Sequence, residues 1–328
     1  MIIRFASIFL AAACPAFALS EQHAEGNFEV TPGARLVVEV DFGNIEVTRA
    51  TDNKVAVTAT RKIEGLPEAQ ESEYVSAAPI LLAKEGNTVL VRARREGKGK
   101  NWSWSGNVQM QARYEIRVPA EINAELSTGG GEIAATEISG SCKAESCGGN
   151  LKFTRVRGPL RANTSGGQIT LEACDGALRI ETSGGKIDTL AGSGSLDAST
   201  SGGSIAVRNF SGDTKVETSG GALKLENIRG RLIGETSGGS ISATVPAPLP
   251  GDIKLETSAG QIDIALPPDA GLDLNAETSE GSVTSELPMI TKRAGREGLR
   301  GTINGGGKAL VLRTGAGNIL IKSTSPGR

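Results

Sequence analysis

Residues 97–107, GKGKNWSWSGN, contain both tryptophans of the chain and two lysines. If this stretch is extended, Trp102 and Trp104 point to the same side, beside Lys98 and Lys100. Paired aromatic rings near ammonium groups suit a sugar ring or a membrane interface. These four residues are therefore the candidate contact for a ligand or partner. The other interpretation, which we favour, is a hairpin loop that folds its rings over the edge of the solenoid.

Acidic residues recur at one position of a repeat, and basic residues often stand two positions before them. The acidic column comprises Glu145, Glu181, Glu217, Glu235, Glu256 and Glu277. The basic column comprises Lys143, Arg161, Arg179, Lys215 and Lys254. Two interpretations remain open, a solvated face of weak ion pairs and a cation-binding rail. We favour the first, in which each pair contributes less than ~1 kcal/mol.

Enzyme chemistry and cofactors find little support in the residue types. His23 is the only histidine, and it is predicted to precede the fold, so Ser–His and Cys–His pairs and histidine-based zinc sites are disfavoured. A calcium roll needs an aspartate at one fixed turn position, whereas the aspartates here fall at different phases. The net charge of −2 does not resemble the basic footprint of a nucleic-acid-binding protein. The sequence therefore predicts no catalytic residues, no metal site, no cofactor and no nucleic-acid partner.

Glycine sets the elements that must position these side chains. From Gly131 to Gly239 it stands at every ninth residue, and from Thr128 the chain divides into blocks of eighteen and later twenty-one residues. Most blocks begin with Thr-Ser-Gly-Gly or a close variant, and apolar residues alternate between the glycines. Alternation with period two indicates strands. We attribute the glycines to backbone angles that other residues avoid, and the hydroxyls to hydrogen bonds within the turn.

The repeat predicts an all-β fold, a parallel β-solenoid with about 18 residues and two strands per coil. Equivalent corners then stack about 4.8 Å apart. Ile169, Ile187, Ile205 and Leu223 are predicted to form one buried column, and Glu181, Glu217 and Glu235 to be exposed. An antiparallel meander of nine-residue repeats is the competing fold, but it does not explain why alternate turns differ.

The same register predicts that no disulfide forms among Cys142, Cys147 and Cys174. Cys142 and Cys174 lie two coils apart, roughly 9.6 Å, which exceeds the ~7 Å limit for bridged Cα atoms. Cys147 occupies a corner about five residues, or ~16 Å, from Cys142. We therefore expect three free thiols, two in the core and Cys147 accessible.

Several segments precede and follow the repeats. Residues 1–20 read as a secretory signal peptide, with lipid modification of Cys14 as a less favoured interpretation. Residues 21–26 are predicted to be a polar leader, and 27–127 irregular β coils with a helix near 66–78 and the tryptophan loop. Residues 128–285 are the regular solenoid, and 286–328 are a loop and a capping coil. No later stretch is apolar enough to span a membrane.

Three short motifs resemble those of the bacterial "putative adhesin" family of the DUF4097 type. They are Gly43-Asn44-Ile45-Glu46-Val47, then Arg113-Tyr114-Glu115-Ile116-Arg117-Val118-Pro119, and finally LRTGAGNILI. The resemblance covers about residues 27–322 and implies a cell-envelope protein of this fold. It supplies no catalytic residues.

These observations predict an exported, non-catalytic β-solenoid of the periplasm or cell surface. It would act as an adhesin-like binding or scaffold protein toward an unknown envelope protein or glycan, with peripheral membrane contact left open. An envelope-stress sensory module and a degenerate polysaccharide-active β-helix are the alternatives.

Overall fold

The computed structural model describes residues 21–64, 68–95, 109–249 and 251–324. Within these residues the fold is all-β apart from helix α1 (Glu68–Ala77), which confirms the helix predicted at 66–78. The predicted signal peptide with Cys14 lies outside the described residues. The chain forms two compact units, unit 1 up to Thr164 and unit 2 from Ser165, and each is treated by itself.

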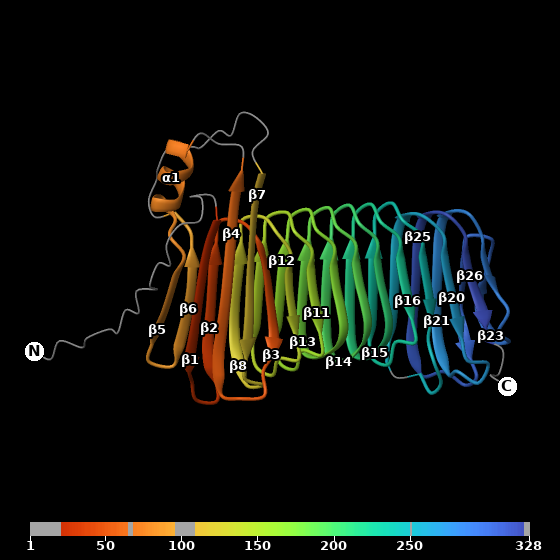
Figure 1. Ribbon diagram of the computed structural model, residues 1–328. Coiled ribbons are helices and arrows are strands. Elements are labelled where there is room, and N and C mark those ends of the chain that lie inside the picture. The colour runs from red at the N-terminus through yellow and green to blue at the C-terminus, as the bar shows by residue number, and fades with distance from the viewer. Residues whose placement is uncertain (1–20, 65–67, 96–108, 250, 325–328) are drawn as a thin grey trace, which may run out of the picture. The chain divides into compact units, whose positions relative to one another are not determined.

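Unit 1 contains α1 and twelve strands (Figure 1). The strands are β1 (Glu21–Glu29), β2 (Ala34–Val40), β3 (Asn44–Arg49), β4 (Lys54–Glu64), β5 (Leu81–Glu85), β6 (Thr88–Ala93), β7 (Gln109–Val118), β8 (Ile122–Thr128), β9 (Ile133–Thr136), β10 (Cys142–Ser146), β11 (Leu151–Thr154) and β12 (Leu160–Thr164).

Parallel coils form the centre of unit 1, and antiparallel strands cover their outer side. β8 pairs with β10 and β10 with β12, each eighteen residues further along the chain. The coil of β2 and β3 lies between the coil of β6 and β7 and the coil of β8 and β9. β5 then pairs antiparallel with β6, and β4 pairs antiparallel with both β7 and β1. The early strands thus depart from the simple coil rule.

The prediction of a polar leader at residues 21–26 is wrong, because these residues begin β1. Ala24 points inward and is 7% exposed, while Glu21, His23 and Glu25 alternate with it on the outer side. The strand pairs with β4 over its whole length. Its outward glutamates gave it a polar composition, which concealed the strand alternation. The other predicted boundaries, at 127 and 285, stay a prediction.

Unit 2 contains fourteen strands. They are β13 (Ile169–Thr182), β14 (Ile187–Thr200), β15 (Ile205–Thr218), β16 (Leu223–Glu226), β17 (Leu232–Thr236), β18 (Ile241–Thr244), β19 (Ile253–Ala259), β20 (Ile262–Leu266), β21 (Leu272–Glu280), β22 (Val283–Ser285), β23 (Met289–Ala294), β24 (Gly298–Ile303), β25 (Lys308–Ala316) and β26 (Ile319–Ser323).

The register of unit 2 confirms the eighteen-residue parallel coil and excludes the antiparallel meander in its repeats. Ile169 pairs with Ile187, Ile187 with Ile205 and Ile205 with Leu223, all in parallel strands. In β13, β14 and β15 the two predicted strands of a coil run together as one bent strand. Further along, the spacing rises to twenty-one residues, from Leu232 to Ile253, as the longer sequence blocks require.

The predicted apolar column is confirmed, and one polar side chain stands in the column beside it. Ile169, Ile187 and Ile205 are fully buried, and Leu223 is 1% exposed. In the neighbouring column Thr189 lies between Leu171 and Val207 and is fully buried. Its hydroxyl has no hydrogen-bond partner among the described residues. A buried hydroxyl without a partner is destabilising.

We therefore expect Thr189→Val to raise the free energy of unfolding by about 1 kcal/mol, because it removes the unsatisfied hydroxyl at nearly constant volume. Thr200→Val is the matched control. Thr200 Oγ1 donates to the Gly185 carbonyl at 2.9 Å and accepts from the Gly203 N–H at 3.3 Å. Loss of these two hydrogen bonds should lower the free energy of unfolding by about 1–2 kcal/mol. Urea unfolding measures both, and shifts of the same sign would contradict the assignment.

The same pair of hydrogen bonds recurs at successive corners of unit 2, as the sequence predicted for the threonine column. Each corner threonine donates to a glycine carbonyl of the neighbouring coil, for example Thr218 Oγ1 to Gly203 at 2.8 Å. It also accepts from the N–H of the fourth corner residue, for example Gly221 at 3.2 Å. These threonines are 2–7% exposed. The hydroxyls thus connect adjacent coils as well as closing their own turn.

The reason predicted for the corner glycines, a backbone angle that other residues avoid, holds for only some glycines at the fourth corner position. Gly131, Gly281 and Gly317 have φ angles of 138°, 154° and 151°, whereas Gly185, Gly203 and Gly221 are not in this region. A Cβ atom on Gly203 would lie only 1.9 Å from the Gly185 carbonyl oxygen. At these three glycines, close stacking of successive corners therefore requires glycine.

The sequence predicted that the C-terminal coil caps the solenoid. This prediction is wrong, because the coil is inserted between other strands of unit 2. β25 lies between β19 and β21, and β26 lies between β20 and β22, all parallel. Thr278 consequently bonds to Gly317 rather than to the preceding corner. β24 pairs antiparallel with β21 on its other side, and β23 pairs antiparallel with β24. The predicted stacking of successive corners is thus interrupted after Thr257.

Among the described residues, Cys142, Cys147 and Cys174 form no disulfide, as predicted. Cys142 and Cys174 are buried and Cys147 is exposed. For the protein without residues 1–20, we expect three titratable thiols in the denatured, non-reduced state and one in the native state. Ellman titration under both conditions measures this, and a single thiol after denaturation would contradict the register.

Candidate functional site

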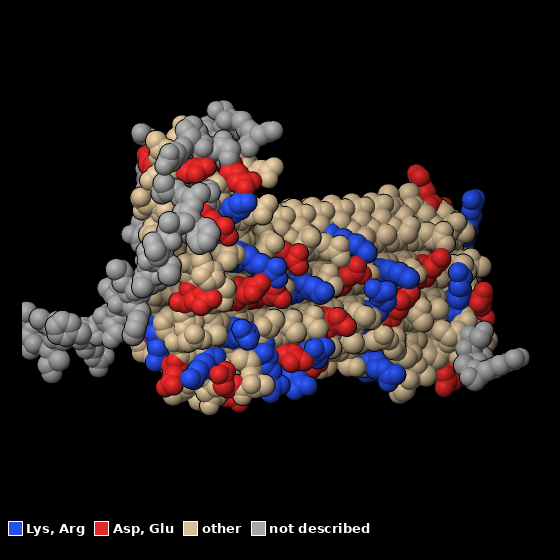
Figure 2. All heavy atoms as spheres, in the orientation of Figure 1, with Lys and Arg blue, Asp and Glu red and all other residues tan. Residues whose placement is uncertain are grey.

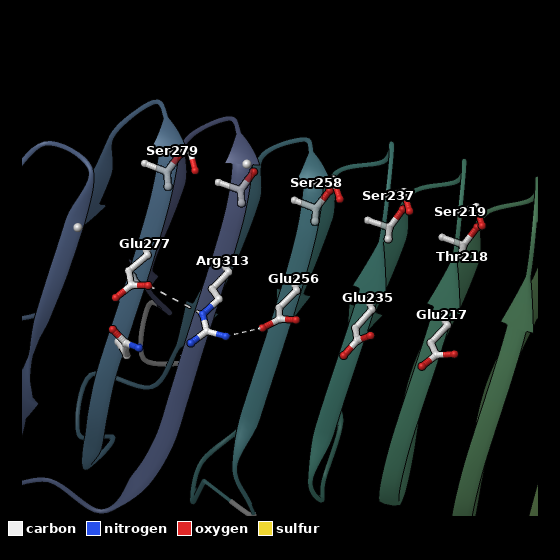
Figure 3. A pocket seen from close by; sticks show the side chains of 18 of the residues that line it. Glu217, Thr218, Ser219, Glu235, Ser237, Glu256, Ser258, Glu277, Ser279 and Arg313 are labelled. Carbon is white, nitrogen blue, oxygen red and sulfur yellow. Dashed lines mark hydrogen bonds and ion pairs between the residues drawn. The ribbon is translucent and has the colours of Figure 1, made fainter.

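An open groove of about 1330 Å³ runs over the corners of unit 2. Its walls come from equivalent positions of neighbouring coils, so similar side chains recur along it, except where the strand of Arg313 is inserted between those of Glu256 and Glu277 (Figure 3). The structure shows two parallel rows, one of carboxylates and one of hydroxyls. The carboxylate row is Glu181, Glu217, Glu235, Glu256 and Glu277, and the hydroxyl row is Ser183, Ser201, Ser219, Ser237, Ser258 and Ser279.

Strand alternation positions both rows. Thr218 points inward at the corner, so Glu217 before it and Ser219 after it point outward into the groove. Ser219 is exposed, but Glu217 is half-buried, with 41% of its side chain exposed. Glu235 is similar at 38%. Glu181 is exposed, as predicted. The prediction of full exposure is wrong for Glu217 and Glu235, because Lys215 on the same strand and Lys254 of the next coil respectively cover part of each side chain.

Four glutamates of the row form ion pairs. Glu217 pairs with Lys215 at 2.7 Å, on the same strand. Lys254 bridges Glu235 at 2.8 Å and Glu256 at 2.9 Å. These hydrogen bonds, with Glu235 first, raise the pKa of Lys254.

The remaining pairs lie where the C-terminal coil is inserted. Arg313 of β25 lies between Glu256 and Glu277, at 3.2 and 4.0 Å (Figure 3). Arg300 adds a contact to Glu277 at 3.3 Å. The row is thus a ladder of compensated charges, which agrees with the favoured interpretation of a solvated face.

A basic turn borders the groove. Arg293 and Arg296 lie at the connection of β23 to β24, are exposed, and line the groove beside Glu297. Elsewhere on the visible face, positive and negative side chains are intermixed (Figure 2). The surface in view therefore offers hydrogen-bonding groups of both kinds rather than a field of one sign.

The predicted contact residues Lys98, Lys100, Trp102 and Trp104 lie outside the described residues. The acidic column was visible in the sequence, and the structure brings its unit 2 members together. The hydroxyl row was missed as a surface, because its serines were interpreted only as turn residues. The signal was present, since the serine follows each inward threonine and must point outward.

The described residues contain no group of three histidine, cysteine or acidic side chains arranged to hold a metal ion. None of their helices is long and apolar enough to cross a membrane. The groove presents repeated hydroxyls and paired carboxylates. Such a surface can hydrogen-bond a polar ligand along its length.

The solved structures that were found to be similar to this chain have low sequence identity to it. A putative adhesin from Bacteroides fragilis is 18% identical, with a TM-score of 0.42, over 76% of this chain and all of that chain. One from Parabacteroides distasonis is 12% identical, with a TM-score of 0.45, over 74% of this chain and 97% of that chain. A putative cell adhesion protein from Clostridium sporogenes is 14% identical, with a TM-score of 0.26, over 92% of this chain and 100% of that chain.

No curated protein matches the chain. The sequence profile of the family described as Toastrack DUF4097 matches residues 34–322, which is most of the chain. The match includes the coils of both units and the groove of unit 2. The chain therefore belongs to the Toastrack DUF4097 family.

Proposed function

We propose that this protein is an exported, non-catalytic, adhesin-like binding protein of the bacterial cell envelope. Its groove in unit 2 would receive an extended polar polymer, such as an envelope glycan. Membership of the Toastrack family and the adhesin-like sequence motifs support the general role. The groove supports the class of ligand.

The observation that carries the proposal is the repetition of the groove wall. From Ser183 to Ser258 each coil presents an outward hydroxyl one strand spacing from the next, and most of these coils also present an outward carboxylate. The inserted coil of β25 presents Arg313 and Gly315 instead, before the row resumes at Glu277 and Ser279. A site for one small molecule needs a few polar groups that converge on it. A row of equivalent groups instead matches a ligand that repeats. The ion pairs leave little net charge on the carboxylate row, which suits a neutral, hydroxyl-rich chain.

The same ion pairs argue against acid–base catalysis in the groove. Hydrolysis of glycosidic bonds generally uses two carboxyl groups with distinct roles, one of them with a raised pKa. Here Glu217, Glu235, Glu256 and Glu277 each form an ion pair with lysine or arginine, so their surroundings do not set one carboxyl apart as an acid and another as a base. The groove therefore supports binding rather than cleavage.

Blocking the hydroxyl row tests this function. Ser219→Trp and Ser237→Trp place a ring in the groove without changing the buried threonines. We expect each to weaken binding to purified envelope polysaccharide or peptidoglycan about tenfold, a loss of roughly 1.4 kcal/mol. Sedimentation with the insoluble polymer, or surface plasmon resonance with a soluble one, measures this.

Ser242→Trp is the matched control, because Ser242 is also exposed but lies on β18, outside the groove. It should bind like the unchanged protein. Equal binding by all three variants, or an equal loss in the control, would contradict the groove as the contact. Fractionation of cells that express the full chain tests export separately.

A further inference from the structure

Unit 1 buries an arginine to which the described residues supply no ion-paired carboxylate. Arg61 of β4 is 1% exposed. Its Nε and one terminal nitrogen donate to the side-chain oxygen of Gln22, and its other terminal nitrogen donates to the Ala78 carbonyl at 2.7 Å. Both acceptors are neutral. These contacts use three of the five N–H groups of a guanidinium, and burial lowers the pKa of Arg61.

The acidic side chains near Arg61 form no ion pair with it among the described residues. One oxygen of Asp41 accepts from the backbone N–H of Arg95 at 3.2 Å and from its side chain at 3.4 Å. Glu71 of α1 is 9% exposed and Glu21 lines the same pocket as Arg61, yet neither accepts a hydrogen bond from Arg61. Arg61 therefore carries a buried charge that no described carboxylate contacts directly.

The two guanidinium groups share one aromatic ring. Arg61 lies 5.5 Å and Arg95 5.9 Å from the centroid of Tyr74. Phe42 packs against the same tyrosine, with centroids 6.1 Å apart, and Met110 joins the cluster. Burial raises the pKa of Tyr74 to about 12, so its ring and hydroxyl stay neutral at physiological pH. Cationic and apolar groups therefore lie side by side.

These groups line one pocket of about 770 Å³. Lys62 and Arg113 also line it, but each pairs with glutamates, Lys62 with Glu64 and Arg113 with Glu46 and Glu115. Their charges are therefore already compensated. A buried charge without compensation costs folding free energy, and a bound anion would recover part of that cost.

We propose that this pocket binds an anionic amphiphile, whose carboxylate or phosphate head lies near Arg61 and Arg95 and whose apolar part contacts Phe42 and Met110. Charge-assisted hydrogen bonds from guanidinium groups to oxyanions are among the strongest that proteins form. The apolar side chains disfavour a free inorganic ion as the natural ligand. This proposal is independent of the groove in unit 2.

Calorimetric titration of the purified protein with octanoate, octyl phosphate, octanol and inorganic phosphate tests the proposal. At least one of the two anionic amphiphiles should bind about tenfold more tightly than octanol, a difference of roughly 1.4 kcal/mol. The stronger of the two identifies the head group. Binding of octanol with equal affinity, binding of inorganic phosphate as tight as that of octyl phosphate, or no binding of either amphiphile would overturn it.

Two variants with opposite expected effects on affinity distinguish a specific binding site from a general loss of structure. Arg95→Gln removes the less buried cation and should weaken binding about tenfold. Asp41→Asn removes the competing carboxylate and should strengthen binding several-fold. Arg35→Gln is the control, because Arg35 is also an arginine of unit 1, pairs with Glu125 and does not line the pocket. An unchanged affinity in Arg95→Gln, or a weaker one in Asp41→Asn, would overturn the proposal.

Discussion

Ile205→Asp should prevent folding or drive the protein into aggregates. Ile205 is fully buried between Ile187 and Leu223. A carboxylate there would have no partner, and an unpaired charge in a dry interior is strongly unfavourable. We expect a loss of about 4 kcal/mol or more in the free energy of unfolding. Soluble yield and the urea midpoint of any soluble fraction measure it.

Two controls define what the result means. Ile205→Val keeps the column apolar and should cost about 1 kcal/mol. Glu217→Ala removes an outward ion pair with Lys215 and should change stability by less than ~0.5 kcal/mol. If the aspartate variant and Glu217→Ala behaved alike, the assignment of inner and outer positions would be wrong.

Gly203→Ala should be the most damaging small substitution at a corner. The added Cβ would lie 1.9 Å from the Gly185 carbonyl oxygen and 2.5 Å from its carbon. Both contacts are with backbone, so only separation of the two coils can relieve them. We expect a loss of about 3 kcal/mol, at the upper end for overpacking. Thermal and urea unfolding measure the change.

Gly202→Ala, one residue earlier, is the matched control. A Cβ there meets its nearest atom at 3.8 Å, an ordinary contact. Stability should change by less than ~0.5 kcal/mol or rise slightly, because alanine restricts the unfolded chain. Equal losses in the two variants would show that chain flexibility at the corner, rather than close stacking, makes glycine necessary.

The repeats allowed most of the fold to be predicted because their alternation and period describe the same structure. The apolar column from Ile169 to Leu223 follows from period two, and the eighteen-residue register follows from the recurring corner. The corners also held a clue to the role of their glycines. The third position accepts Ala259 and Glu280, whereas the fourth remains glycine, at Gly260 and Gly281 in those two corners. The short distance between neighbouring backbones explains that difference, and at Gly281 a φ of 154° contributes as well.

The parts that were mispredicted depend on pairing between distant segments. β1 and β4 alternate like other strands, but nothing local in them indicates antiparallel partners. The insertion of β25 and β26 could not be predicted, because the strands of unit 2 share one apolar pattern. The sequence therefore does not indicate which of these strands become neighbours. The Arg61 pocket was invisible for the same reason, since β1, β4 and α1 supply its contacts from separate parts of the chain.

The inserted C-terminal coil imposes an order on the assembly of unit 2 when the chain emerges from its N-terminal end, as in synthesis. Each coil from β14 to β20 can add to the preceding one as soon as it has emerged. Residues 272–285 cannot dock in this way, because their parallel neighbours are residues 308–323, which emerge last. The unit therefore closes only when nearly the whole chain has emerged. A polypeptide that stopped before residue 308 would leave two sets of strand edges unpaired, and such edges invite aggregation and proteolysis.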